Sequence, residues 1–517
     1  MSHFASAKTP AGFTATLFAN DLKDPRGLLI TENDLHLVLE RGGSACVTLL
    51  WDDDDDGVSS TSERLRCIAT APRLNHGLAV FNGYLFASSD TIVYRWPWAG
   101  GRNVIDSNLR KEIVINIAYG ADGSSLGADR GHTTRTLAFD RQGRLFVSVG
   151  SYGNVDANSH RSRVRVFDGL AEASAAAVEF NSGAVWADGL RNEVGLAFDA
   201  SGVLWGVENG ADNLNRADIG GDVHNTNPGE ELNKLDRPGA YYGYPRCWSE
   251  DELAAPHGLG ARTQWAWPSF MPATTDAWCR DPANVVPPSL VMPAHTAPLG
   301  IAFFGAADAH LPLQQQPGPT CSGNTNSTTA SSASSAGTAG AFPCAWVGDA
   351  FVALHGSWNR QPPVGYSLVR LPFSGGEPTG EVLSVVAHGG DGAVWAGGVR
   401  PVDVRFDSRG RLFFTSDKSN ELVMVTYSGG GMGGDDAGGG GGDAAAGTNV
   451  ASGGGALGDG RSGALGVAAV VGIAVGATAA AALAALVAAR WYFRGKRRAR
   501  SRNSDAMPAG LSTLSTL

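Results

Sequence analysis

One acidic stretch of the chain has the spacing of a calcium-binding loop. It reads WDDDDDGVSSTSE, and its fixed positions follow D-x-D-x-D-G-x5-E: Asp52, Asp54, Asp56, Gly57 and Glu63. Carboxylates packed this closely repel one another unless a cation lies among them, and their hard oxygens suit Ca²⁺. Ser59 stands at position 8, where such loops carry an apolar residue. We predict a structural calcium site in a loop between strands that braces the first β-unit; the alternative is a solvated acidic loop.

The elements that position such sites form a repeated β-rich unit. Two apolar strands joined by a Gly or Asn turn, with a third strand after them, recur six times at 26–40, 76–96, 135–151, 194–210, 299–304 with 348–358, and 402–417. Asp-x-x-Gly between alternating apolar runs is a hairpin signal, and helical periodicity is almost absent before residue 460. The sequence therefore predicts an all-β fold, a six-bladed β-propeller. The strand GFTATLFA (12–19) lacks a blade of its own and is predicted to complete the last blade and close the ring.

Five phrases in order give the chain a family resemblance. They are LNHGLAVFNGYLFASSDTIVYRW, GHTTRTLAFDRQGRLFVSVGS, DGLRNEVGLAFD, NPGEELNKLDRPGAYYGYPRCW and HGSWNRQPPVGYSLVRLPF. Together they resemble the pyrroloquinoline quinone (PQQ)-dependent sugar dehydrogenases, the soluble glucose, aldose and sorbosone dehydrogenase group, and within it the pyranose dehydrogenase branch. The resemblance covers about residues 11–427. It implies oxidation of a sugar CH–OH group with PQQ and Ca²⁺ as cofactors.

This chemistry needs a base for the hydroxyl proton and an electron sink that side chains cannot supply. The resemblance makes His132 the general base. It makes Arg191 and Asn192 the pair that contacts the quinone, with Arg191 stabilising its reduced form. From the residues alone, His132 could equally be a loop histidine bonded to a hydroxyl, and Arg191 a surface arginine.

The three carboxylates of PQQ call for basic partners. The resemblance implies that Arg400 binds one of them, but a second family arginine two residues later is Val402 here. Further candidates lie at the ends of other repeats and could replace it: His355, Arg360, His76 and Arg26. Each of these has a purely structural role as its alternative. Trp358 is predicted to stack on the flat cofactor, or else to lie in the core.

A second cation site follows from the resemblance. The segment 208–211, Glu-Asn-Gly-Ala, resembles a Glu-His-Gly-Pro turn whose backbone carbonyls hold calcium near the cofactor. Backbone ligation tolerates both replacements, so Gly210 and Ala211 are the expected carbonyl ligands. Asp212 could add a carboxylate.

The C-terminal part predicts a membrane anchor. Residues 464–489 contain no charged residue, and as a helix they would span roughly 39 Å, enough to cross a bilayer. A Gly/Ala/Asp-rich flexible linker (428–463) precedes them, and a basic tail (490–517) follows. The positive-inside rule puts that tail in the cytoplasm and the propeller (1–427) in an extracellular or lumenal space. The alternative is an Ala-rich buried helix.

No signal peptide is visible at the N-terminus. Either the leader is missing from the sequence or the helix inserts after synthesis and leaves the body in the cytosol. The six cysteines lack zinc spacing and suit disulfides of an extracellular body; pairing of successive cysteines is a guess, because sequence cannot fix connectivity. The sequon Asn326-Ser327-Thr328 lies in a low-complexity insert, 314–342, expected to be a surface loop.

Charge limits the partners. The chain carries a formal net charge of −10, although its last 28 residues hold seven Lys/Arg and one Asp, and such an acidic body excludes nucleic acid as a partner. We expect a membrane-anchored quinoprotein that oxidises a small sugar and passes its electrons to an unknown acceptor, for which a cytochrome is a candidate. The alternative is a non-catalytic propeller ectodomain that binds protein or carbohydrate, because one fold hosts both. A propeller lactonase would need a centre of several carboxylates that these phrases lack.

Overall fold

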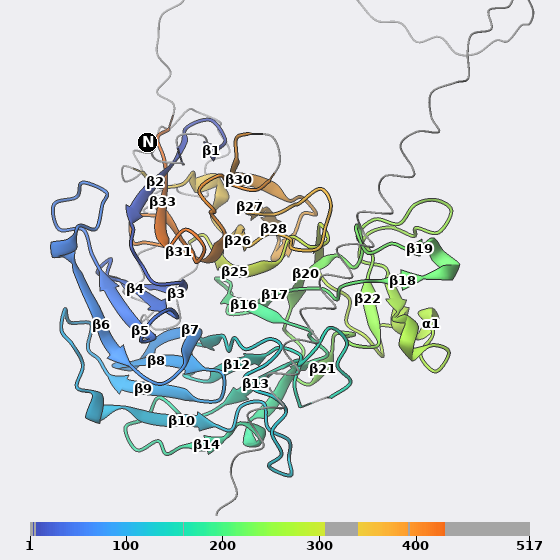
Figure 1. Ribbon diagram of the computed structural model, residues 1–517, viewed down its shortest axis with the longest axis horizontal. Coiled ribbons are helices and arrows are strands. Elements are labelled where there is room, and N and C mark those ends of the chain that lie inside the picture. Colours follow the sequence, from blue (N-terminus) through green and yellow to red (C-terminus); the bar gives the residue numbers. More distant parts are fainter. Residues whose placement is uncertain (1–3, 5–6, 159, 306–339, 391–392, 430–517) are drawn as a thin grey trace, which may run out of the picture. The chain divides into compact units, whose positions relative to one another are not determined.

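The computed structural model describes residues 4, 7–158, 160–305, 340–390 and 393–429. This part of the chain is built almost entirely of β-strands, and its one α-helix is α1 (Asp276–Arg280). The strands form six sheets of four or five strands, arranged around a common axis (Figure 1). The predicted six-bladed, all-β propeller is confirmed.

The blades follow one another along the chain, each listed from its inner strand outward. The first contains β3 (Pro25–Ile30), β4 (His36–Glu40), β5 (Cys46–Leu50) and β6 (Arg64–Thr70). The second contains β7 (Leu74–Phe81), β8 (Tyr84–Ser89), β9 (Val93–Pro97), β10 (Lys111–Ile115) and the edge strand β14 (Val178–Glu179). The third contains β11 (Leu137–Phe139), β12 (Leu145–Val149), β13 (Arg163–Phe167), β15 (Ala184–Asp188) and the edge strand β21 (Ala240–Tyr241).

The remaining blades repeat this order. The fourth contains β16 (Glu193–Phe198), β17 (Leu204–Glu208), β20 (Glu230–Lys234) and β24 (Leu290–Met292). The fifth contains β25 (Pro298–Phe303), β26 (Ala350–Leu354), β27 (Ser367–Leu371), β30 (Leu383–His388) and β1 (Ala7–Lys8). The sixth contains β31 (Pro401–Phe406), β32 (Leu412–Ser416), β33 (Glu421–Tyr427) and β2 (Phe13–Ala19).

Short elements decorate the ring. Outside the fourth blade lie α1 and the hairpins β18 (Asn215–Arg216) with β19 (Gly221–Asp222) and β22 (Cys247–Ser249) with β23 (Gln264–Ala266) (Figure 1). A further hairpin joins β28 (Phe373–Ser374) to β29 (Glu377–Pro378). The 3₁₀ turns are Thr61–Glu63, Ser107–Leu109, Phe180–Ser182, Ala217–Ile219, Pro268–Phe270 and Cys344–Trp346.

The two ends of the propeller sequence close the ring together. β2 pairs antiparallel with β33, and Phe13 lies opposite Tyr427. A strand from the start of the chain thus completes the last blade, as predicted. The sixth blade therefore has its full four strands only when the first residues of the domain pair with the last.

The inner strands approach one another closely around the axis. Each contacts the inner strands of its two neighbouring blades, in the cyclic order β3, β7, β11, β16, β25, β31. A Cβ placed on Gly27 would lie 2.1 Å from the carbonyl oxygen of His76, and one on Gly77 would lie 2.1 Å from that of Arg135. The Gly that precedes the apolar run in several repeats is therefore required by backbone approach.

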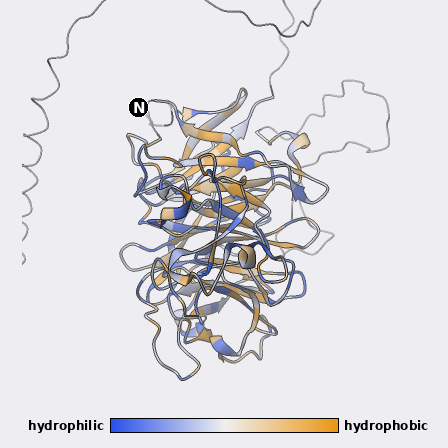
Figure 2. Ribbon diagram, turned by 90° about the vertical axis from the view of Figure 1, so that its right-hand side faces the viewer, coloured by the Kyte–Doolittle hydropathy of each residue, from blue (hydrophilic) through white to orange (hydrophobic). Residues whose placement is uncertain are grey.

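The core lies between blades rather than at one centre. Leu37, Leu49 and Trp96 belong to a buried cluster shared by the first two blades, and Phe351 and Phe414 to one shared by the fifth and sixth. Figure 2 shows hydrophobic colour along the strands and hydrophilic colour mainly in the connecting loops. The alternation of apolar residues in each repeat thus becomes packing between neighbouring sheets.

Covalent links strengthen two places. Cys46 pairs with Cys67 inside the first blade, and Cys247 pairs with Cys279 between β22 and α1. Both agree with pairing of successive cysteines, and Cys344 is disulfide-bonded as well.

The predicted membrane helix 464–489, the linker, the tail and the sequon lie outside the described residues, as does the insert apart from 340–342. In the portion that the structure covers, no helix has the length and apolarity to span a bilayer.

Candidate active site

The candidate residues share one face of the ring. In each blade the inner strand starts at this face and the antiparallel second strand returns to it, so that Glu193, which begins β16, pairs with Glu208, which ends β17. His76, His132, Arg191 and Arg400 all lie in or just before an inner strand. The loops that follow the second strands contribute the other candidate residues. The repeat therefore gathers residues far apart in sequence at one end of the axis.

His132 lies at this face in the neutral form that a general base requires. Its Nδ1 lies 3.0 Å from the carbonyl oxygen of Ser151, which can only accept, so Nδ1 carries the ring proton. Nε2 is then the unprotonated nitrogen. Burial, and next the positive charge of Arg191, lower the pKa of His132 to about 3.

The loop that carries His132 is held by two buried arginines. The guanidinium of Arg161 donates to six carbonyl oxygens, those of Leu126, Gly127, Arg130, His132, Gly150 and Ser151. Arg135 donates to four carbonyl oxygens, that of His132, which it shares with Arg161, and those of Asp90, Ala128 and Thr134. Both side chains are fully buried. Sequence reasoning assigned no role to either residue, because both bind backbone carbonyl oxygens, and such partners leave no side-chain pattern in the sequence.

Arg191 and Asn192 lie next to His132. Asn192 Oδ1 and His132 Cβ are the nearest neighbours of Gly150, where they would lie 2.4 and 2.6 Å from an added Cβ. Arg191 Nη2 forms an ion pair with Asp212 at 3.0 Å and also donates to Asn154 Oδ1. The structure therefore brings His132, Arg191, Asn192 and Asp212 together. Asn154, after the second strand of the third blade, is the partner that the sequence did not reveal.

A second basic group lies across the axis. Asp417 accepts from Arg26 Nη1 at 2.7 Å and lies 3.0 Å from His355 Nε2. Arg400 donates to the carbonyl oxygens of His355 and Gly356. Asp417 was missed, because nothing in its local sequence marks it. Although Asp417 is largely buried, hydrogen bonding to His355 and the charges of His355 and Arg26 hold its pKa below the usual range.

His76 belongs to the same region and has an unused polar atom. Its side chain is buried, and its Nδ1 has no hydrogen-bond partner in the described residues. Burial, followed by the charge of Arg26, lowers its pKa well below the ordinary value. His76 is thus a neutral imidazole with an orphaned nitrogen among arginines.

The loop after β26 spans the two groups. Asn359 Nδ2 donates to Asp212 Oδ1 at 2.8 Å, and Arg360 Nη1 donates to the carbonyl oxygen of Ala294. Between them Trp358 is 76% exposed, so it does not lie in the core. Arg360 is engaged by the backbone of the same chain. Trp358 is thus exposed at the edge of the site, and the next residue, Asn359, is hydrogen-bonded to Asp212.

The turn predicted to hold calcium packs on buried carboxyl groups. Gly210 N donates to Glu230, and Glu208 accepts from Arg191 N. Burial raises the pKa of Glu230 to about 7 and that of Glu208 well above its usual value. The carbonyl oxygens of Gly210 and Ala211 accept no hydrogen bond from the described part of the chain, so both can serve as ligands. Asp212, in contrast, is already occupied by Arg191 and Asn359.

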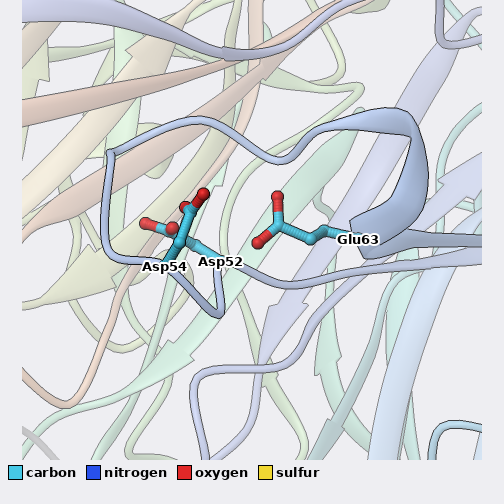
Figure 3. A group of neighbouring side chains, drawn as sticks. All are labelled: Asp52, Asp54 and Glu63. Carbon is cyan, nitrogen blue, oxygen red and sulfur yellow. The ribbon is translucent and has the colours of Figure 1, made fainter.

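The acidic loop joins β5 to β6. Asp52, Asp54 and Glu63 each present a carboxylate oxygen within 4.8 Å of the others. In Figure 3, Asp52 and Asp54 lie together and Glu63 faces them across the loop. Asp56 is outside this group; its carboxylate accepts from Val58 N instead. Desolvation, together with the nearby Asp55 and Asp56, raises the pKa of Asp52.

The residues present fit a flat, acceptor-rich anion such as PQQ. Arg26, Arg400 and the orphaned His76 Nδ1 lie on one side of the face, and His132, Arg191 and Asn192 on the other. The carboxylates in this set, Asp212 and Asp417, are already paired with arginines. Both groups are thus rich in hydrogen-bond donors.

Comparison with known proteins agrees with this architecture. Residues 7–428 match the family described as TrAA12-like. A pyrroloquinoline quinone-dependent sugar dehydrogenase of Hypocrea jecorina is 29% identical over 437 residues, which are 81% of this chain and 88% of that protein. A pyrroloquinoline quinone-dependent pyranose dehydrogenase of Coprinopsis cinerea is 31% identical over 70% of this chain, and the match spans only 44% of that longer relative.

Solved structures give the same result. The calcium structure of the Trichoderma reesei carbohydrate-active enzyme family AA12 protein has a TM-score of 0.65 at 29% identity and covers 82% of this chain and 98% of that one. The holo form of the pyranose dehydrogenase PQQ domain from Coprinopsis cinerea has a TM-score of 0.62 at 27% identity and covers 81% and 97%. From its propeller, its gathered residues and these matches, we conclude that the chain belongs to the TrAA12-like family.

Proposed function

We propose that this chain is a PQQ-dependent dehydrogenase that oxidises a CH–OH group of a pyranose or related sugar. The observation that carries the proposal is the state of His132, whose Nδ1–H is bound by Ser151 while Nε2 stays unprotonated beside Arg191 and Asn192. The names of the relatives from Hypocrea jecorina and Coprinopsis cinerea support it.

His132 Nε2 takes the hydroxyl proton of the sugar while the C–H bond breaks and a carbonyl group forms. PQQ, when bound, would supply the two-electron sink that this oxidation needs. Asp212 and Asn154 fix Arg191 in position. Its positive charge is therefore in place to stabilise the quinone oxygen that would become negative on reduction. The Ser151 contact keeps the ring of His132 in one orientation.

Arg400, Arg26 and His76 are proposed to bind the cofactor carboxylates, and the Arg26–Asp417–His355 group to replace the family arginine that is Val402 here. Trp358 is free of core packing and is available to stack on the cofactor plane. Arg360 supports the same loop. The carbonyl oxygens of Gly210 and Ala211 are proposed to hold a calcium ion nearby. Asp212 would be a further ligand through its carboxylate, in addition to its contacts with Arg191 and Asn359.

The experiment is a titration of the purified full chain with PQQ in the presence of Ca²⁺, followed by a dye-linked assay with aldoses and ketoses. Binding of PQQ together with turnover supports the proposal. Absence of both favours a non-catalytic propeller that binds protein or carbohydrate. The Arg400→Ala variant should weaken PQQ binding, whereas Arg370→Ala, a partner of Asp349 away from this face, should not.

We also propose that helix 464–489 anchors the enzyme, with the propeller extracellular or lumenal and the tail 490–517 cytoplasmic. The apolar length and the basic flank of the sequence support this. Extraction of membranes with carbonate, and protease protection of the tail, test the anchor and its orientation. An electron acceptor outside the membrane, a cytochrome for example, would accept the electrons.

A further inference from the structure

A polar pocket is built from the same two loops that hold the proposed catalytic base. Its volume is about 490 Å³, within the range of ligand pockets. One wall belongs to the loop before β11, at residues 125–130, and the other to the loop after β12, which begins with Tyr152 at this pocket. His132 lies two residues after the first wall, and Ser151, which binds its Nδ1, directly precedes Tyr152. The pocket and the base therefore share one face of the ring.

Arg161 connects the pocket to the base through hydrogen bonds. Its side chain lines the pocket and donates from Nη1 to the carbonyl oxygens of Leu126 and Gly127 in the wall. From Nη2 it donates to the carbonyl oxygens of His132, at 2.9 Å, and of Ser151, at 3.1 Å. One guanidinium thus fixes the pocket wall and the loop of the base relative to each other.

Tyr152 places an exposed aromatic ring in this pocket. The residue is 46% exposed. A Cβ added to Gly127 would lie 2.5 Å from the Cε2 atom of Tyr152, so the ring packs on that glycine, and Arg161 Cζ lies 5.8 Å from the ring centre. The backbone N of Tyr152 donates to Asp156 Oδ2 at 2.8 Å, which fixes the loop. The ring is therefore held in place before any ligand arrives, with much of its surface open.

The wall also offers polar groups that a ligand can reach. The side chains of Asp129 and Arg130 are exposed, and within the described residues neither forms a hydrogen bond or an ion pair. The acidic groups of the lining, Asp129 and Asp156, balance its two arginines, Arg130 and Arg161. Such a wall suits a neutral ligand whose hydroxyl groups donate to the carboxylate and accept from the guanidinium, and whose C–H face packs on the aromatic ring. A pyranose unit has both kinds of surface.

Resting on the proposed function, we propose that this pocket is a subsite for the sugar unit linked to the one that is oxidised. The oxidised unit lies at His132, and the linked unit packs on Tyr152 and forms hydrogen bonds with Asp129 and Arg130. The substrate class is then a neutral disaccharide or the end of a longer glycan. A free monosaccharide leaves the subsite empty and is bound less tightly.

The first test is calorimetric titration of the PQQ-free full chain with cellobiose, maltose and lactose, and with glucose for comparison. We expect at least one disaccharide to bind about tenfold more tightly than glucose, and Tyr152→Ala to remove that advantage, because the C–H face loses its aromatic contact. Equal affinity for glucose and all three disaccharides, or disaccharide binding unchanged in Tyr152→Ala, would overturn the subsite.

The matched control for the ring is Tyr84→Ala. Tyr84 also lies beside an arginine, with Arg95 Cζ 4.3 Å from its ring centre, but it stands at the start of β8, the end of a second strand that lies away from this face. Tyr84→Ala should bind the disaccharide as the wild type does. An equal loss of binding in both variants would show that Tyr152 acts only through the fold, against the proposal.

A second pair of variants tests the polar contacts. Asp129→Ala should weaken disaccharide binding about tenfold, because a carboxylate acceptor is lost. The control is Asp168→Ala, since Asp168 is another exposed aspartate without a partner in the described residues, in the turn after β13 at the opposite end of its blade. Equal binding by these two variants would contradict the contact with Asp129.

Kinetics of the PQQ-loaded enzyme separate a sugar subsite from a site for the electron acceptor. The ratio of kcat/KM for the disaccharide to that for glucose should fall about tenfold in Tyr152→Ala and stay unchanged in Tyr84→Ala. A rise in the KM for the dye in Tyr152→Ala, with no change in this ratio, would assign the pocket to the acceptor and overturn the subsite. Because the titrations need no PQQ, failure of the subsite is distinguished from failure of the dehydrogenase proposal.

Discussion

At the scale of single residues, His132 carries the proposed chemistry. Replacing it in His132→Gln removes the base but keeps a polar side chain of similar length. We expect kcat to fall by about 10²–10⁴-fold, the usual contribution of a general base, with little change in PQQ affinity. His257→Gln, in the loop before β23, is the control. A kcat within threefold of the wild type would remove His132 from the mechanism.

The pH dependence of kcat/KM in the wild-type enzyme is a second test of His132. With a pKa lowered to about 3, His132 is unprotonated from neutral pH down to well below the ordinary histidine range. The acid limb of kcat/KM in the free enzyme should accordingly lie well below pH 6.5.

Arg161 is a positioning residue for that base. Arg161→Lys keeps the charge but loses the planar fork that reaches six carbonyl oxygens, and Arg161→Met loses both. We expect both variants to lose stability, by roughly 3 kcal/mol or more, because buried carbonyl groups are left unsatisfied. Since its charge also lowers the pKa of His132, the acid limb of kcat/KM should rise in Arg161→Met and stay nearly in place in Arg161→Lys.

Arg165→Lys is the control for this pair, because Arg165 is a buried arginine in β13 and donates to carbonyl oxygens away from the His132 loop. Thermal unfolding gives the stability, and assays well below the melting temperature give the profile. An acid limb that moves equally in all three variants would contradict a positioning role for Arg161.

The residues that the sequence revealed differ physically from those it did not. His132 and Arg191 stand in the quoted phrases and Arg400 directly precedes an inner strand, so the resemblance located all three. Asp417 and Asn154 lie in turns after second strands, and their roles exist only because the ring brings distant blades together. No local pattern marks such a partner.

At the scale of the elements, the blades determine how the protein responds to acid. His36 in β4 is buried between Phe18 of the sixth blade and Phe413, with ring centroids 4.7 and 4.5 Å away. Burial, and then the charge of Arg411, lower its pKa to about 3. In the unfolded chain it takes a proton near pH 6.5, so stability is complete above that pH and falls as the pH drops toward 3.

At pH 5 this single group should destabilise the fold by about 2 kcal/mol relative to pH 7. His36→Leu should therefore lose less stability between pH 7 and pH 5 than the wild type does, as measured by urea unfolding at both values. The comparison is made within one pair of proteins, so other titrating groups cancel. Parallel losses in both would show that His36 is protonated in the folded state.

The six repeats could be predicted from the sequence because apolar and polar residues alternate along the blade strands and turn residues follow each strand. The glycines of β3 and β7 were visible in the sequence, but only the structure shows that they are required by backbone approach around the axis. The edge strands β14 and β21 were not expected, because two residues carry too little pattern.

At the scale of the whole molecule, the ring closes through the pairing of β2 with β33, next to the junction of the first and sixth blades. The acidic loop lies there: Ser59 N donates to the carbonyl oxygen of Phe18 in β2, and Asp55 pairs with Arg409 of the sixth blade. The long-range pairing of β2 with β33 was predictable from an unmatched strand. The contact of the acidic loop with the sixth blade was not, because the loop sequence indicates a cation but not its neighbours.

A calcium ion among Asp52, Asp54 and Glu63 would hold this junction, because it removes the repulsion between carboxylates that lie within 4.8 Å. Chelation with EGTA should therefore lower the melting temperature, and added Ca²⁺ should restore it. In Asp54→Asn the shift should shrink, whereas Asp106→Asn, at the cap of an exposed turn in the second blade, should respond as the wild type does. The loop lies away from His132. If Asp54→Asn loses the EGTA-induced shift in melting temperature but still binds PQQ, the calcium ion that causes the shift is assigned to this loop. A shift of equal size in Asp54→Asn and Asp106→Asn would place the calcium elsewhere.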